Sequence, residues 1–160
     1  LAAYVPIQRA VNGTPRASRQ VWLATSATEL AVERIDERTL ALSPRGGFLL
    51  DPGSLLLRDP RRPVDEAVVL EGLAFWTDAR MPDGRPARVL ARFDRSLDDR
   101  SLLWMQWRDA GFVPFTPPAV GAHVALPAVD YFRVWFGDAV RMPFPATLEV
   151  EDRAAQGPGR

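Results

Sequence analysis

The residue types that carry most enzyme chemistry are scarce in this chain. Its 160 residues include one histidine, His123, no cysteine and no lysine, so all twenty basic side chains are arginine. Without cysteine there is no disulfide, thiolate nucleophile, zinc–thiolate site or iron–sulfur cluster. Without lysine there is no Schiff base and no phosphate-binding loop of the Walker type. The use of arginine alone is also what a GC-rich genome produces, because most of these positions place no demand on guanidinium geometry.

His123 is a poor candidate for a catalytic base. It lies in the alternating segment 121–126, and no serine is flanked by glycines at the spacing of a nucleophile elbow. A transition-metal site would need several imidazoles or thiolates. Asp94, Asp98 and Asp99 are close enough in sequence to bind calcium, but they lack the pattern of a calcium loop, so a solvated loop explains them better. We therefore predict no catalytic residue, no bound metal and no cofactor.

Carboxylates leave one enzymatic alternative open. A pair of them can perform acid–base hydrolysis, as in glycosidases, and the chain offers thirteen aspartates and seven glutamates. The sequence does not show which of them pair, and their scatter over polar strand faces is what surface solubility requires. A carboxylate-dependent hydrolase or a carbohydrate-binding domain therefore stands as the alternative to a non-catalytic module.

Aromatic side chains give the better functional candidate. Trp104 and Trp107 are three residues apart, so a strand sends them to opposite faces. If one face is core, the other tryptophan is exposed or covered by another element. An exposed tryptophan beside Arg108 and near Phe112 would suit a protein contact or a stacked sugar ring, since aromatic and arginine side chains anchor interfaces. The alternative is that both tryptophans are buried, with the aromatic segment 131–136 covering one of them.

Charge and hydropathy narrow the range of partners. Twenty arginines balance twenty carboxylates, so the basic surface that nucleic-acid binding requires is not expected. No apolar run approaches the roughly 20 residues that cross a bilayer, so no span is expected in this chain. The only side-chain charges before residue 28 are Arg9, Arg16 and Arg19, which is typical both of a segment that follows a membrane helix and of an ordinary surface segment. The absence of cysteine leaves the compartment open.

The first half of the chain is patterned as β-structure. Apolar and polar side chains alternate along three segments, 20–25, 29–35 and 39–43. The turn formers at 36–38 separate the last two, which predicts a hairpin. The glycine pair at 46–47 then interrupts the chain, and the leucine run 55–57 indicates a helical turn or an edge strand.

Two further hairpins are predicted in the second half. Their strands are 67–72 continuing into 73–79, then 87–93, and after these 102–107 and 112–116. The turn at 81–84 joins the first pair. A helix beginning near Ser96 and ending by Gly111 competes with the second hairpin. The β-favouring residues Phe112 and Val113 follow directly and favour the hairpin.

These segments predict one domain. Residues 120–126 form a further strand, and the aromatic segment 129–136 is expected to close the core. No linker divides the body and no internal repeat is present. We predict an all-β fold, a single small sandwich or partly open barrel of about eight or more short antiparallel strands, over residues 20–150. An N-terminal arm, 1–19, precedes it and a disordered tail, 151–160, follows.

A resemblance adds a cellular context. The run from Leu97 to Trp104, its continuation through Trp107–Asp109 and Gly111–Pro118, and Val120–Gly121 resemble a segment in the soluble C-terminal portions of uncharacterised multi-pass bacterial membrane proteins. The stretch 36–42 and the glycine pair before Phe48 are similar too, so the resemblance covers about half of the chain. It implies a membrane-anchored parent in a bacterial cell envelope, and it implies nothing about activity.

We therefore expect a non-catalytic interaction or accessory module, which the resemblance would make the water-facing domain of a bacterial membrane protein. Its partner would be another protein or the parent itself. The residues expected to bind are Trp104, Trp107, Arg108 and Phe112.

Overall fold

The structure is a computed structural model that describes residues 19–24, 28–49, 67–108 and 111–129. In these ranges there are eight β-strands and no helix, which confirms the all-β prediction. The strands are β1 (Leu30–Arg34), β2 (Thr39–Pro44), β3 (Val68–Leu70), β4 (Leu73–Arg80), β5 (Pro86–Phe93), β6 (Met105–Arg108), β7 (Gly111–Pro114) and β8 (His123–Leu126). All the described residues belong to one compact unit. They contain no helix with the length and apolarity of a membrane span.

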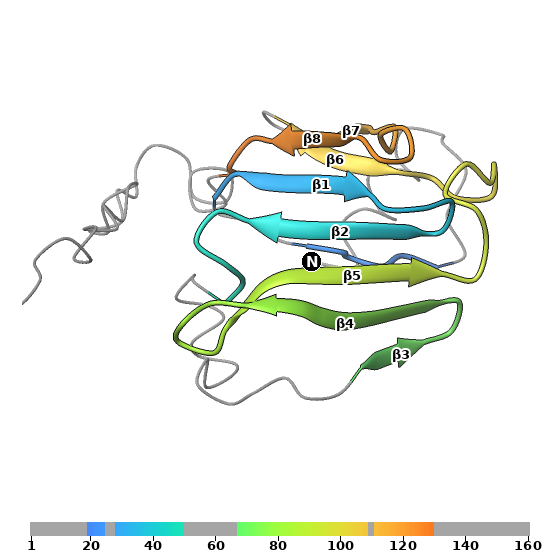
Figure 1. Ribbon diagram of the computed structural model, residues 1–160. Helices are drawn as coiled ribbons and strands as arrows, with labels where there is room; N and C mark the ends of the chain where they lie inside the picture. Colours follow the sequence, from blue (N-terminus) through green and yellow to red (C-terminus); the bar gives the residue numbers. More distant parts are fainter. Residues whose placement is uncertain (1–18, 25–27, 50–66, 109–110, 130–160) are drawn as a thin grey trace, which may run out of the picture. The chain divides into compact units, whose positions relative to one another are not determined.

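Six of the strands form one antiparallel sheet in the order β3-β4-β5-β2-β1-β8, and β6 pairs with β7 in a separate hairpin. Among the described residues the large sheet ends at β3 on one side and β8 on the other, so it is not closed into a barrel. The segment 19–24 lies behind this sheet in Figure 1, and its side chains, with Trp104 and Phe115 from the two ends of the β6–β7 hairpin, cover one face of the sheet. We call this covered side the inner face and the opposite side the outer face.

The core lies on the inner face and follows from the period of two along each strand. Leu30 and Val32 of β1 point inward, and the register places Val32 opposite Leu42 of β2. Leu40 of β2 lies opposite Ala91 of β5 on the same face. The remaining members of the buried cluster are Leu73 and Leu97, with Val21, Leu23, Trp104 and Phe115 packed against it from the covering layer.

Turn residues fix two of the three local hairpins of the large sheet. Between β1 and β2, the carboxylate of Asp36 accepts hydrogen bonds from the Arg38 backbone N–H at 2.7 Å and from the Thr39 hydroxyl at 3.0 Å. Between β4 and β5, Asp83 accepts from the Arg85 backbone N–H at 3.1 Å. Gly84 follows Asp83 with a positive φ of 87°, a conformation that glycine adopts without strain. Both predicted hairpins are therefore confirmed.

Other sequence predictions need correction. Residues 19–24 form no strand, although Val21 and Leu23 pack on the core as the alternation predicted. The segment from Ser96 to Trp104 is a series of turns and irregular chain, and the β6–β7 hairpin follows it where a helix was the competing prediction. Val120 and Gly121 form a turn, so the last strand begins only at His123.

Several predictions concern residues outside the described ranges. These are the arm before Arg19, the leucine run 55–57, the aromatic segment after Val129 and the tail 151–160. The domain limits of 20 and 150 stay predictions for the same reason.

Candidate binding surface

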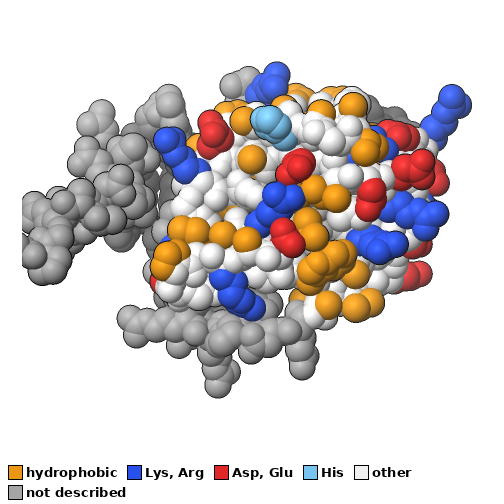
Figure 2. Space-filling model, viewed as in Figure 1, with side chains coloured by type: hydrophobic (Ala, Val, Ile, Leu, Met, Phe, Trp, Pro, Cys, Tyr) orange, Lys and Arg blue, Asp and Glu red, His pale blue; other side chains and the backbone are white. Residues whose placement is uncertain are grey.

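Charged side chains form a network of ion pairs in the middle of the outer face. Arg88 of β5 contacts Glu33 of β1 (Nη2 to Oε2, 3.0 Å) and Asp78 of β4 (Nε to Oδ2, 3.1 Å). The contact with Glu33 passes over β2, which is possible because Ala41 lies between them with only a methyl group. Ala41 is 1% exposed although it points to the outer face. Figure 2 shows acidic and basic side chains gathered together at this place.

His123 lies on the same face, at its β8 edge. Its side chain is exposed and its backbone pairs with that of Glu33. No serine or second histidine accompanies it in the described residues. The structure therefore gives His123 a surface position on an edge strand.

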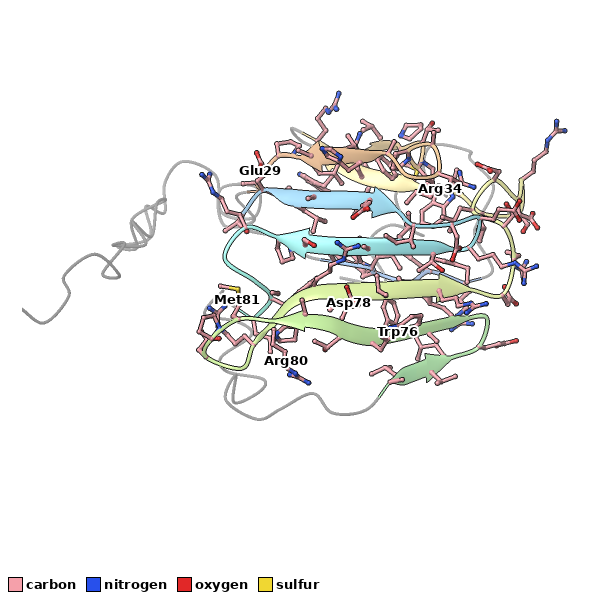
Figure 3. The ribbon with its side chains drawn as sticks, in the orientation of Figure 1. Glu29, Arg34, Trp76, Asp78, Arg80 and Met81 are labelled. Carbon is pink, nitrogen blue, oxygen red and sulfur yellow. The ribbon has the colours of Figure 1, made fainter. Side chains whose placement is uncertain are left out.

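Apolar side chains collect at the opposite edge of the sheet. Val68, Val69 and Leu70, which make up the whole of β3, are 49%, 75% and 39% exposed. Trp76 of β4 is a diagonal neighbour of Val69 on the outer face, and Leu90 of β5 lies opposite Trp76. Trp76 and Leu90 are half-buried. Val68 and Leu70 lie opposite Phe75 and Leu73 and therefore point to the inner side of the edge. We call the five residues Val68, Val69, Leu70, Trp76 and Leu90 the β3 edge surface, which includes both sides of this edge; Figures 2 and 3 show the apolar side chains over β3 and β4 on the outer side and the position of Trp76.

Trp104, one of the predicted binding residues, contributes to the core. Its Nε1–H donates to the carbonyl oxygen of Leu97 at 2.9 Å. Its ring packs edge-on against Phe93 of β5, with ring centroids 5.2 Å apart. The side chain is half-buried and holds the chain after β5 against the sheet, so it is not available as an exposed anchor.

The other three predicted binding residues lie together on the β6–β7 hairpin. Trp107 pairs with Phe112, and their rings meet edge-on at 4.9 Å between centroids. Phe112 also contacts Trp22 of the covering segment at 5.9 Å, and Arg108 is exposed. Trp107 and Phe112 are both half-buried. The hairpin thus brings Trp107, Arg108 and Phe112 together, but its aromatic rings are largely occupied with each other and with Trp22.

The three aspartates considered for calcium are each engaged elsewhere. Asp94 pairs with Arg95 at 2.9 Å, and Asp99 accepts from the Ser101 backbone N–H at 2.8 Å. Asp98 forms a two-bond pair with Arg34, which is described next. In the part of the chain that the structure describes, no three His, Asp or Glu side chains are grouped as a metal site.

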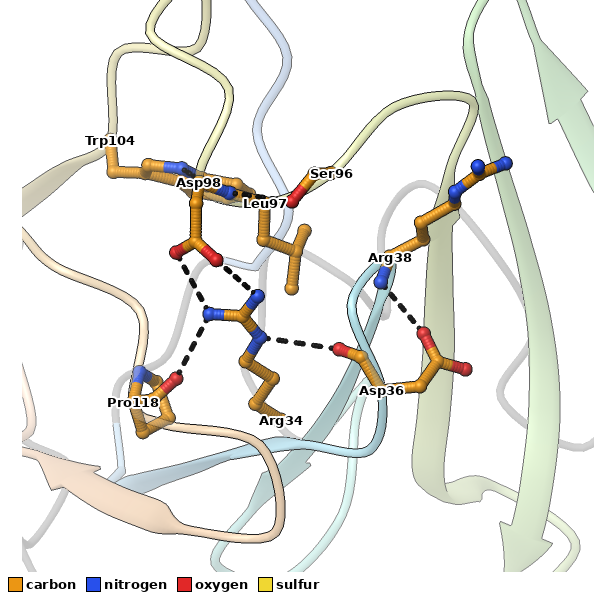
Figure 4. A network of polar contacts seen from close by, with 8 residues as sticks. All are labelled: Arg34, Asp36, Arg38, Ser96, Leu97, Asp98, Trp104 and Pro118. Carbon is orange, nitrogen blue, oxygen red and sulfur yellow. Dashed lines mark hydrogen bonds and ion pairs between the residues drawn. The ribbon is translucent and has the colours of Figure 1, made fainter.

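Arg34 is a buried charge that organises one end of the sheet (Figure 4). Its Nη1 and Nη2 contact the Oδ1 and Oδ2 of Asp98 at 2.9 and 2.6 Å. Its remaining donors reach the carbonyl oxygens of Asp36 at 3.2 Å and Pro118 at 3.5 Å. The hydrogen bond from Arg34 lowers the pKa of the Asp98 carboxyl. This group, which we call the Arg34 clasp, joins β1 to two loops that are distant in sequence.

Comparison with known proteins gives no relative: no protein family, no curated protein and no solved structure matches the chain. The resemblance to soluble portions of bacterial membrane proteins therefore stays a prediction.

Proposed function

We propose that this chain is a non-catalytic protein-interaction module and that the β3 edge surface is where its partner binds. The observation that carries this proposal is the exposure of β3, whose outer edge is paired with no strand among the described residues. Three of the six large apolar side chains that are exposed in the described residues belong to this one three-residue strand. Edge strands of soluble proteins usually carry a charge, a proline or a bulge that prevents another strand from pairing with them.

The neighbouring outer face supports a protein partner. Val69, Trp76 and Leu90 extend the apolar area from the edge onto the face, and a half-buried tryptophan is a common anchor of protein interfaces. Beside this area, Glu33 and Asp78 are both bound to Arg88. Arg88 compensates only one of these two negative charges, so a partner that covers this region would have to place a positive group beside it. An apolar centre with charged groups at its margin is the usual composition of an interface.

The two surfaces favoured by the sequence and by the structure differ. The β6–β7 hairpin carries Trp107 and Phe112, whose rings already pack on each other. Val69 has no comparable cover and is 75% exposed. Burial of exposed apolar area stabilises a complex by about 25 cal/mol per Å² before the costs of association. Among the described residues, the side chains of β3 therefore have more apolar area left to bury than the paired rings of the hairpin.

A site-specific photo-crosslinker tests this proposal. We would place it at position 69 in the full chain, within cells of the source organism, and at position 120 as the control, because Val120 is also exposed (56%) but lies far from β3 in the sheet order. The expected result is a discrete protein adduct from position 69 and none from position 120. Equal adducts from both positions, or none from position 69, would contradict the proposal.

A further inference from the structure

Within the described ranges β3 is the last strand of the sheet, and its outer edge suits a strand of the same sequence. We propose that two copies of this chain join their six-stranded sheets by antiparallel pairing of β3 with β3. The inference rests on the proposed function, because it names the partner of the same edge. The pairing of β3 with β4 is regular, running from Val68 opposite Phe75 to Leu70 opposite Leu73. The bulges of this region lie further along, between Thr77 and Arg80 of β4, so β3 itself is straight enough to accept a neighbour.

The register of such a pairing follows from symmetry. Two identical antiparallel strands are related by a two-fold axis, and an axis at Val69 places Val69 opposite Val69 of the second copy and Val68 opposite Leu70. The N–H and C=O groups of alternate residues in a strand point to the same edge. In this register the groups that point outward from one copy face the groups that point outward from the other, so they can form hydrogen bonds. It also keeps facing side chains on the same side of the joined sheet. A shift by one residue would pair Val68 with Val69. The backbone hydrogen bonds would then be lost, and the facing side chains would no longer match.

The charges at the ends of β3 are compatible with this register. Glu71, directly after the strand, would lie opposite Ala67 of the second copy and not opposite another carboxylate. Arg19 of the same chain already pairs with Glu71, donating to its carbonyl oxygen and lying 3.6 Å from its carboxylate. In this register Glu71, which Arg19 compensates, faces a methyl group and not a second Glu71.

The other free edge offers no equivalent contact. On β8, Val124 and Leu126 pack against the core, which leaves His123 and Ala125 as the exposed residues. Pairing of β3 with β8 would also be head-to-tail and would extend without closing, whereas pairing of β3 with β3 ends at two copies. The observations therefore favour a closed dimer over a fibre.

The size of the contact sets its strength. Stable dimers usually bury at least about 1,200 Å² in total, and three residues per copy with a few neighbouring side chains fall short of that. We therefore expect a reversible dimer whose population rises with protein concentration over the micromolar to millimolar range.

Sedimentation equilibrium of the purified full chain over a concentration series is the test. The wild type should follow a monomer–dimer equilibrium. Val69→Lys should weaken association by at least about tenfold, because the two-fold axis brings two ammonium groups together. Val120→Lys is the matched control and should associate like the wild type. Circular dichroism would establish that both variants keep the strand signal, which the exposure of Val69 and Val120 favours.

A charge-swap mixture tests the register itself. Val69→Lys and Val69→Glu should each be monomeric alone, and an equimolar mixture of them should form a heterodimer, because only the register centred on Val69 brings position 69 against itself. A chain that stays monomeric at every concentration, a dimer unaffected by Val69→Lys, or a mixture that fails to associate would overturn the inference. If the purified chain is monomeric while the crosslinker at position 69 captures a different protein, self-pairing is wrong and the proposed interaction module stands.

Discussion

Arg34 is a charged residue that occupies a core position. By its position in β1 it belongs to the core face, two residues after Val32. Its guanidinium is buried, with 6% of the side chain exposed, while the carboxylate of Asp98 that binds it is 68% exposed. A buried charge is costly unless its donors are satisfied. Removing Asp98 should therefore destabilise the fold more than leaving Asp98 without Arg34 does. Water can replace Arg34 at Asp98, but it cannot readily replace Asp98 at Arg34.

This asymmetry predicts an unusual order of stabilities. Asp98→Ala should leave the guanidinium buried without its main partner, so it should be less stable than the double variant Arg34→Met/Asp98→Ala, which removes the charge as well. Arg34→Met alone should lose about 2 kcal/mol, the value of hydrogen bonds to a charged group. Urea unfolding monitored by tryptophan fluorescence would measure all three. Losses that simply add in the double variant would contradict the clasp.

The two tryptophans of the predicted binding surface should differ in their effect on stability. Trp104 contacts Phe93 and donates to Leu97, so Trp104→Ala should cost about 3–5 kcal/mol, as for other large-to-small changes at a core. Trp107 is half-buried on the hairpin and meets Phe112 edge-on, so Trp107→Ala should cost less, about 1 kcal/mol. Denaturant titrations of both variants decide the order. Equal losses would place Trp107 in the core as well and would argue against any binding role for the hairpin.

At the scale of elements, alternation and turn chemistry predicted the hairpins well. Leu40 and Leu42 share a face, and the Asp36 side chain accepts hydrogen bonds in the turn before them. Both the apolar alternation and the turn former therefore lie within a short stretch of sequence. Alternation was less informative for 19–24, because it reports that Val21 and Leu23 are buried, and not that a neighbouring strand bonds to the backbone between them. The sequence therefore predicted which side chains enter the core more reliably than it predicted the hydrogen-bonded ladder.

The β3 edge surface could not be predicted in the same way. Val68, Val69 and Leu70 form a short apolar run, which on its own indicates a strand buried on both faces. Their exposure depends on β3 being last in the sheet order, and that order depends on contacts between β2 and β5 that are distant in sequence. Arg34, by contrast, carried a visible signal, since a charged residue stood among core positions.

The loop after β2 approaches the β4–β5 hairpin closely at Gly47. Gly47 has φ 83°, and a Cβ there would lie 2.9 Å from Met81 Cγ and 3.0 Å from the Pro86 carbonyl oxygen. Gly84 has a similar φ of 87°, but a Cβ there would meet nothing within 4 Å. Gly84→Ala should therefore lose about 1–2 kcal/mol from the backbone conformation alone. Gly47→Ala should lose more, because the backbone at Pro86 must also move. Thermal unfolding of the two variants would compare them. Equal losses of stability would mean that the loop can shift away from Pro86 without further destabilisation.

For the whole molecule, the carboxylates predict a loss of stability in acid. Hydrogen bonds from Arg34 lower the pKa of Asp98, and those from the Arg38 backbone N–H lower the pKa of Asp36. A carboxyl whose pKa is lower in the folded chain contributes its stabilisation in full above the unfolded value of about 3.9 and loses it as the pH falls through the folded value. Urea midpoints should therefore fall as the pH drops below about 4. Asp98→Asn should fall less steeply over that range, and a wild type that gains stability in acid would contradict the assignment.

The Arg34 clasp also has a consequence for synthesis on the ribosome. Asp98 and Pro118 follow Arg34 by 64 and 84 residues, so both emerge long after the β1–β2 hairpin has left the exit tunnel. During that interval the guanidinium of Arg34 is hydrated, although it lies on the inner face of the sheet, which is buried in the folded protein. It opposes early collapse of the hairpin onto whatever apolar segment is nearby, since burial without its partners is unfavourable. The nascent chain therefore seals this end of the sheet last, when the loop that carries Pro118 arrives.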